Sequence, residues 1–346
     1  MKYLVELPLK RIGSYISSRL TTLICGFLVV TGFSALLTTG TALAQEQSKS
    51  VVLTTVPAPY SIASILAKGT DISIRNIPED GRRMYGIQRY LHKFRSKLTP
   101  VFSRADAVVT IGKLWRKDPL YAAVRAENVR VVNIDATRPW SSSMTGVSVV
   151  DEPEISNAWS IVSGNSVSAQ RPSIYFWMSL ANGARMADII ATDFMKLYPQ
   201  DADKVRNNLS SLQSRIHNLR LKYEKAFSSV ENLSVVCLTC EFVYLTDETG
   251  IYVDSYLVKQ DIKWTDVDLA MLTSRLKDNA IPVVIHKWMP SEPIQNAIKA
   301  GGAKLVILDP LDGSTLSGKT LSSEYYLEKM EQNLEALHKA FHSATK

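Results

Sequence analysis

Residues 201–228, DADKVRNNLSSLQSRIHNLRLKYEKAFS, carry the clearest periodic pattern in the sequence. Apolar residues recur there every three or four positions, which places them on one side of a helix. The stripe consists of Val205, Leu209, Leu212, Ile216, Leu219, Tyr223 and Phe227. Pro199 precedes the pattern, and Asp201 is a candidate N-cap. A helix over this stretch would be about 40 Å long, which is enough to join two lobes.

Strand-like runs alternate with helical patterns on both sides of this segment. Four runs precede it, at 51–55, 72–77, 106–112 and 129–135, and four follow it, at 234–239, 250–256, 281–286 and 304–310. Such alternation is typical of parallel sheets with helices on their faces. We therefore predict an α/β fold of two lobes, each with a parallel-type four-stranded sheet flanked by helices, joined by one long connecting helix.

The predicted boundaries are 1–44 for a signal peptide, 45–199 for an N-terminal α/β lobe, 200–229 for the connecting helix and 230–346 for a C-terminal α/β lobe. The Ser-rich stretch 138–173 is irregular, and we expect a loop or insertion at the edge of the first lobe. The long helix lacks the complementary flanking charges of a coiled coil. A monomer is therefore expected rather than a coiled-coil dimer.

The N-terminus has the layout of a secretory signal peptide. A basic leader with Lys10, Arg11 and Arg19 is followed by an apolar stretch over 20–37 and by small residues up to Ala44. Cleavage is expected after Ala44, which predicts a periplasmic protein. An uncleaved membrane anchor is the alternative, but Thr and Gly interrupt the apolar stretch and no stop-transfer charges follow it.

Charge and length exclude several functional classes. The formal net charge of the chain is +7, and the lysines and arginines are spread along the sequence instead of forming a basic stripe. No nucleic-acid partner is therefore predicted. No later segment is long and apolar enough to cross a bilayer. About 300 mature residues suit two domains with ample core.

Two cysteines, Cys237 and Cys240, remain after the predicted cleavage, in the strand-like run SVVCLTCEFVY. No second pair is present to complete a zinc site of the four-cysteine type. We interpret them as small buried residues of a strand. A disulfide, a thiolate ligand or a thiol redox function is the alternative.

Five segments, taken in order, carry a family resemblance. They are VVLTTVPAPYSIASILAKG (51–69), SRADAVVTIG (103–112), YFWMSLANGARMADII (175–190), CEFVYLTDETGI (240–251) and LDPLDGSTLSGKTLSSEYYLEKMEQNLEAL (308–337). Together they resemble the zinc/manganese-type, ZnuA/TroA-like solute-binding proteins of bacterial ABC importers, over most of 51–341. The resemblance implies a binding protein without catalytic activity or catalytic cofactor. It would capture a metal ion, zinc-type by resemblance, and deliver it to an ABC permease in the inner membrane.

The same resemblance explains a sequence that otherwise indicates nucleotide binding. Residues 313–320, GSTLSGKT, match the phosphate-binding loop G-x-x-x-x-G-K-[ST]. Zinc-type members of the family carry Gly-Lys-Thr at this place. A nucleotide hydrolase also needs a later strand with a carboxylate for Mg²⁺, and only one helical segment follows. No nucleotide is expected to bind.

The metal ligands of the family, two His, a His or Glu, and an Asp, match this chain poorly. The resemblance places Tyr175 at the second histidine and Thr239, with Cys240 and Glu241 beside it, at the third ligand. The first position falls on Tyr90, close to His92, or on Tyr85, depending on where counting starts. Only Asp309 keeps the expected residue type. The predicted candidate ligands of a zinc or manganese ion are therefore Asp309, Tyr175, Thr239, Tyr90, His92 and Glu241.

This unusual set leaves other solutes open, because a neutral tyrosine is a poor zinc ligand. Tyrosine phenolates with Asp309 suit ferric iron, whereas an aromatic-lined cleft suits a small organic ligand. Nearby substitutes such as His286 could also bind the metal, although a histidine at the end of a buried strand is commonly structural. A further alternative is an interaction or adhesion protein that has kept the scaffold and lost metal binding.

Overall fold

The computed structural model describes residues 49–153, 171–313 and 321–344. By internal contacts the chain divides into Met1–Gln47 and Ser48–Lys346, and the second unit contains every element discussed below. The predicted signal peptide and its cleavage site lie outside the described residues. Within the described ranges, no helix combines the length and apolar character needed to span a membrane.

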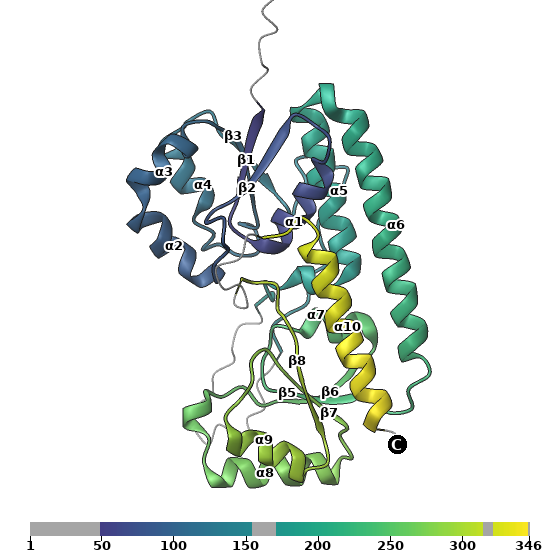
Figure 1. Cartoon of the computed structure of the whole chain (residues 1–346). Coiled ribbons are helices and arrows are strands. Elements are labelled where there is room, and N and C mark those ends of the chain that lie inside the picture. The colour runs from purple at the N-terminus through teal and green to yellow at the C-terminus, as the bar shows by residue number, and fades with distance from the viewer. Residues whose placement is uncertain (1–48, 154–170, 314–320, 345–346) are drawn as a thin grey trace, which may run out of the picture. The chain divides into compact units, whose positions relative to one another are not determined.

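The first sheet contains four parallel strands in the order β2-β1-β3-β4 (Figure 1). The strands are β1 Ser50–Thr54, β2 Ile72–Asn76, β3 Ala105–Thr110 and β4 Val132–Asp135. The helices between them are α1 Pro57–Leu66, α2 Met84–Lys93, α3 Arg95–Phe102 and α4 Leu120–Arg125. All four strands predicted for the first half are confirmed, with ends that differ by up to three residues.

The second sheet repeats this arrangement, with parallel strands in the order β6-β5-β7-β8. Its strands are β5 Ser234–Cys237, β6 Tyr252–Tyr256, β7 Val283–His286 and β8 Lys304–Ile307. Its helices are α7 Val243–Thr249, η4 Asp261–Lys263, α8 Asp266–Asp278 and α9 Glu292–Ala300, and α10 Tyr325–Ala344 follows. The predicted fold class is therefore confirmed. Cys240, predicted within a strand, lies beyond the end of β5.

The long helix predicted between the two sheets is confirmed as α6, Ala202–Phe227. The connection begins with η2 Phe176–Met178, α5 Leu180–Leu197 and η3 Pro199–Asp201. Five residues of the apolar stripe are buried, and the other two, Leu209 and Leu219, pack on the core while partly exposed. Asp201 precedes α6, but its side chain does not cap the helix. Its carboxylate accepts from the backbone N–H of Asp71 at 3.1 Å instead.

The buried hydrophobic side chains form three clusters, because successive side chains of each strand point to opposite faces of its sheet. Val52 and Val109 of the first sheet share one cluster with Val235 and Ile285 of the second sheet. The neighbouring residues along these strands point the other way, because successive side chains of a strand face opposite sides. Leu53 thus packs with α2, α3 and α4, and the outer face of the second sheet packs with α8 and α9. Both sheets are therefore covered on both faces, as parallel sheets require.

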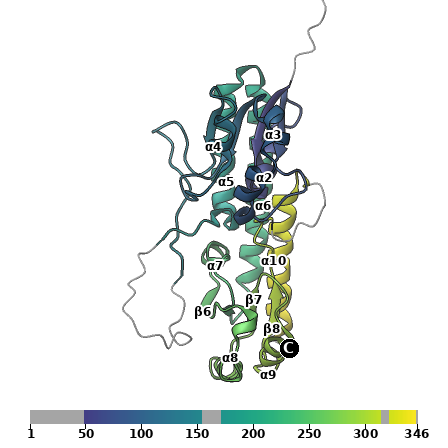
Figure 2. The ribbon, with the colours of Figure 1, turned by 90° about the vertical axis from the view of Figure 1, so that its left-hand side faces the viewer.

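Helix α10 returns along the shared cluster and lies beside α6 (Figures 1 and 2). Its first turn contacts α1 and the residues that lead into α5. The backbone N–H of Tyr326 donates to Ser61 Oγ at 2.9 Å, and the Tyr326 hydroxyl donates to the carbonyls of Trp177 at 3.1 Å and Ser179 at 3.3 Å. Gly183 of α5 lies directly against this phenol.

The described parts of the irregular stretch, 138–153 and 171–173, contain no helix or strand, as expected of a loop. Its described ends are held together by an isolated antiparallel bridge between Asp151 and Pro172. Just before the bridge, the backbone N–H of Val150 donates to the Tyr244 hydroxyl of α7 at 3.0 Å. The stretch therefore packs against the second half of the chain as well as the first.

We predict that Gly183→Ala lowers the free energy of unfolding by about 1–3 kcal/mol. A Cβ at this position would overlap the Tyr326 hydroxyl oxygen, which its two hydrogen bonds hold in place. Urea denaturation measures the effect. Gly86→Ala in α2 is the matched control, since a Cβ there meets nothing within 4 Å. Equal stability of the two variants would contradict the close approach at Gly183.

Candidate functional site

The strand order determines where a site can form. In each sheet the first strand has the second on one side and the third on the other, so the following loops diverge at the carboxyl ends. Crevices in parallel α/β sheets form at such points. In the second sheet, β5 and β7 are paired up to Cys237 and Ile285, and the next residues of the two loops include Glu241 and Lys287.

Glu241 has partners on both of its carboxylate oxygens. Oε1 pairs with the Lys287 ammonium group, and Oε2 accepts from the Thr239 hydroxyl. The side chains of Glu241 and Lys287 are only 12% and 19% exposed, so little water screens the pair. Lys287 Nζ also lies 5.0 Å from the centre of the Trp288 ring. Glu241, one of the residues predicted near the third ligand position, is therefore already paired with a lysine of the same chain.

The loop after β8 brings the two sheets together. Asp312 accepts a hydrogen bond from the backbone N–H of Met84 at 3.1 Å through its carbonyl oxygen. Gly313 has a φ of 82°, and a Cβ at this position would overlap the carbonyl oxygen of Arg82. The close approach therefore requires glycine. Residues 314–320, the rest of the nucleotide-loop match, lie outside the described residues.

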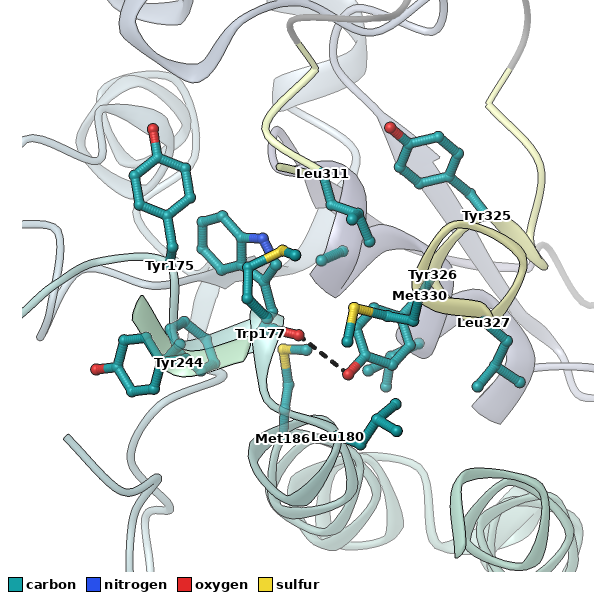
Figure 3. Close-up of a cluster of buried hydrophobic side chains, with 14 of the residues drawn as sticks. Tyr175, Trp177, Leu180, Met186, Tyr244, Leu311, Tyr325, Tyr326, Leu327 and Met330 are labelled. Carbon is teal, nitrogen blue, oxygen red and sulfur yellow. Dashed lines mark hydrogen bonds between the residues drawn. The ribbon is translucent and has the colours of Figure 1, made fainter. Parts of the chain in front are cut away.

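This contact places Tyr85 of α2 beside Tyr175. The two phenols are close enough for each to affect the pKa of the other, and the Tyr175 hydroxyl makes a long hydrogen bond of 3.4 Å to Asp312 Oδ2. Figure 3 shows the Tyr175 hydroxyl pointing away from the buried rings of Trp177 and Tyr326. We name the group formed by Tyr85, Tyr175, Thr239, Glu241, Lys287 and Asp312 the junction site.

Acidic side chains dominate the electrostatics of the junction site. Tyr85 is 66% exposed, and the partial desolvation of its phenol, together with the negative charges of Glu241, Glu152 and Asp312, raises its pKa above the ordinary value. Burial, Asp312 and Glu241 raise the pKa of Tyr175 much further. Both phenols are therefore neutral at pH 7 in this structure. They can donate hydrogen bonds.

Three of the predicted ligands belong to the junction site and three do not. Tyr175, Thr239 and Glu241 lie in it. Tyr90 instead packs against Phe94 with a ring distance of 4.7 Å and lies under the guanidinium of Arg82. His92 is exposed and lines a surface groove with Tyr85, Gln88 and Arg89.

Asp309 is held in a separate network. Its Oδ1 accepts from the backbone N–H of Leu311 at 2.8 Å, and its Oδ2 accepts from the Tyr325 hydroxyl at 3.2 Å. Lys329 Nζ lies 3.9 Å from Oδ2. The carboxylate that bonds Tyr175 is that of Asp312, three residues later in the DPLD sequence.

The junction-site residues that sequence reasoning missed are Asp312 and Lys287. Asp312 is the second acidic residue of the DPLD sequence after β8, but the family resemblance placed the ligand at Asp309. Lys287 carried no signal, because its role depends on the pairing of β5 with β7. Tyr85, one of two options for the first ligand, is the tyrosine of α2 that reaches the site.

The described residues contain no group of three or more His, Cys, Asp and Glu side chains placed to hold one metal ion. Cys237 and Cys240 are both free thiols. Complete burial raises the pKa of Cys237, and burial followed by the charge of Glu241 raises the pKa of Cys240 to about 12. A thiol redox function needs an accessible thiolate. The geometry gives it no support.

A sequence model of the family described as "Zinc-uptake complex component A periplasmic" matches residues 52–340. The chain belongs to this family. Zinc-uptake components are binding proteins of transport systems, so the expectation that the chain is not an enzyme is confirmed. A comparison with curated proteins gave no match by sequence.

Solved structures share the fold of this zinc-uptake family member at low sequence identity. A mutant of FpvC from Pseudomonas aeruginosa has 17% identity and a TM-score of 0.64 over 85% of this chain and 99% of its own. A mutant, metal-free periplasmic metal-binding protein from Candidatus Liberibacter asiaticus has 18% identity and a TM-score of 0.63 over 85% and 100%. Zn(II)-bound AdcA from Streptococcus pneumoniae has 19% identity and a TM-score of 0.62 over 85% of this chain and 58% of its own.

His286, a substitute ligand considered from the sequence, is the last residue of β7 and is buried. Its ring lies 4.4 Å from that of Trp288, and its Nδ1 has no hydrogen-bond partner among the described residues. Burial lowers the pKa of His286 to about 4, so the imidazole is neutral at pH 7. This position agrees with a structural histidine at the end of a buried strand.

We predict that the protein loses stability as the pH falls from about 6.5 to about 4. In this window His286 binds a proton more readily in the unfolded chain than in the folded one, because its folded pKa is lowered. Urea denaturation at a series of pH values measures the loss. His286→Phe should make the profile less steep within this window. Parallel profiles for the variant and the wild type would show that another group is responsible.

Proposed function

We propose that this protein is an extracytoplasmic solute-binding protein that captures a divalent metal ion at the junction site and delivers it to an ABC permease. Membership of a periplasmic zinc-uptake family supports the transport class. The observation that carries the proposal is the meeting of acidic loops from both halves of the chain. The backbone after β8 contacts Arg82 and Met84 directly before Tyr85, and the Asp312 carboxylate of this loop lies 3.4 Å from the Tyr175 hydroxyl.

The donors favour an ion that prefers oxygen. Carboxylates suit Mn²⁺ and similar hard cations, whereas zinc favours imidazole and thiolate. No histidine belongs to the junction site, and its carboxylates, Glu241 and Asp312, are oxygen donors. The solved structures support different ions on one fold, since AdcA is described with Zn(II) and FpvC with Ni²⁺ or Mn²⁺. We therefore propose Mn²⁺ ahead of Zn²⁺, the ion of the family description.

Capture requires a rearrangement in this proposal. The carboxylates come from the loops of different strands and do not share one coordination sphere in the described conformation. An ion bound by Asp312 and Glu241 would stabilise a conformation that brings them closer, and would shift the population toward it. Lys287 must then leave Glu241, because the ammonium group and the metal ion compete for the same carboxylate.

The remaining parts of the proposal follow from the sequence. Export by a signal peptide cleaved after Ala44, action as a monomer, and two lobes over 45–199 and 230–346 joined through 200–229 agree with a periplasmic family. The permease is the partner expected for such a protein.

A second function is favoured by one observation. The charge of Glu241 is already compensated by Lys287, which is what a scaffold that had lost metal binding would also show. Such a protein would act through its surface in adhesion or interaction with other proteins. Replacement of Lys287 separates the two functions.

We predict that Asp312→Asn lowers the affinity for Mn²⁺ at least about 10-fold, because it removes an anionic oxygen donor. Tyr85→Phe should lower it about 3- to 10-fold, because it removes a hydroxyl oxygen from the junction site. Isothermal titration of metal-free protein with Mn²⁺ and with Zn²⁺ measures both constants. Tyr90→Phe is the matched control, since it makes the same change on the same helix outside the junction site. Absence of Mn²⁺ and Zn²⁺ binding to the wild type would exclude the proposed function.

Lys287→Met should raise the affinity for Mn²⁺ about 10-fold or more, because the competing cation is removed from a poorly screened site. Folding stability should fall, since Glu241 loses its partner. The double variant Lys287→Met with Glu241→Gln separates the two effects. It should regain stability and lose the gain in affinity. An unchanged Mn²⁺ affinity in Lys287→Met would favour the scaffold without metal binding.

A further inference from the structure

The last turns of α10 carry two histidines one helical turn apart. His338 and His342 are separated by four residues, and their ring centres lie 4.2 Å apart with the ring planes at 85°. His342 is exposed and His338 is partly exposed. Residues at i and i+4 share one face of a helix, so both imidazoles are presented from the same side.

Aromatic residues of α6 pack against the ring of His338. Its ring lies 6.5 Å from that of Tyr223 and 6.2 Å from that of Phe227, both in edge-to-face arrangements. Phe227 packs in turn against Phe341 of α10 at 6.3 Å. These contacts restrict the position of one imidazole, while the exposed ring of His342 can rotate toward a shared ligand.

The charged neighbours of the pair are engaged elsewhere. Glu335, one turn before His338, accepts from the Tyr223 hydroxyl at 2.9 Å and pairs with Lys339 at 3.2 Å. Burial and the neighbouring His342 lower the pKa of His338, which favours its neutral form, the form that binds metals. Two histidines at i and i+4 on a helix are the arrangement with which helical zinc sites hold one ion.

We propose that His338 and His342 form a second metal site, which binds Cu²⁺, Ni²⁺ or Zn²⁺ through two imidazole nitrogens with water completing the coordination. Imidazole suits these ions, and the general order of affinity places Cu²⁺ first and Mn²⁺ last. The site therefore has the opposite preference from the carboxylates of the junction site. His338 lies 13 residues, or about 20 Å along α10, beyond Tyr325, whose hydroxyl bonds Asp309.

The test is titration of the untagged protein with Ni²⁺ in a buffer without chelators. His342→Ala should lower the affinity of this site about 10-fold or more, because a chelate becomes a single imidazole. His342 is exposed, so its replacement leaves the core intact, which circular dichroism verifies. His217→Ala is the matched control, since this exposed histidine of α6 has no histidine at i±4.

A spectroscopic readout identifies the ligands. The electron paramagnetic resonance spectrum of added Cu²⁺ should show coupling to two nitrogens in the wild type and in His217→Ala, but to one in His342→Ala. Asp312→Asn should leave the spectrum and the Ni²⁺ constant unchanged, so failure of the junction site does not affect this result. Equal Ni²⁺ affinity in wild type and His342→Ala, or an equal loss in His217→Ala, would overturn the proposal.

Discussion

The phenol of Tyr326 is the contact on which the arrangement of the two sheets depends. Its hydroxyl satisfies the carbonyls of Trp177 and Ser179, its backbone N–H is bonded to Ser61, and its ring lies against Gly183. One residue of α10 thus joins α1, the start of α5 and the chain leaving the second sheet. Burial raises the pKa of this phenol well above its ordinary value, so it is neutral and a hydrogen-bond donor at pH 7.

Strand order accounts for the chemistry of the junction site. Because β5 and β7 are neighbours, an acidic residue after one and a basic residue after the other become an ion pair. The charges that remain are acidic, and they come from segments that the sequence separates widely. The carboxylates of Asp312 and Glu241 are poorly screened by solvent, so their charges interact more strongly than charges on the surface. The balance between Lys287 and an incoming cation therefore decides what this site can hold.

Periodicity and composition predicted the strands, their parallel arrangement and α6, because these depend on local patterns and on burial. The site was predictable only in part. Tyr85 and Tyr90 are five residues apart and point to different sides of α2, so an uncertainty of a few positions in a loop exchanges a site residue for a core residue. Asp309 and Asp312 are likewise close in sequence, but only Asp312 bonds Tyr175. Backbone contacts of Asp312 and Gly313 with Met84 and Arg82 position this loop. The spacing of residues in the sequence does not predict such long-range contacts.

The ion pairs between α6 and α10 have a mechanical consequence. Arg215 pairs with Glu324 and Lys222 with Glu331, and both pairs join residues that are 109 positions apart. The two helices thus run parallel, and because both ion pairs are exposed, the packing of Tyr223 and Phe227 against α10 contributes more to their register. Sliding one past the other by a turn would break both pairs and displace Tyr223 and Phe227 from their neighbours on α10. We expect α6 and α10 to move together as one rigid body. Any conformational change would then take place in the loops at the ends of these helices.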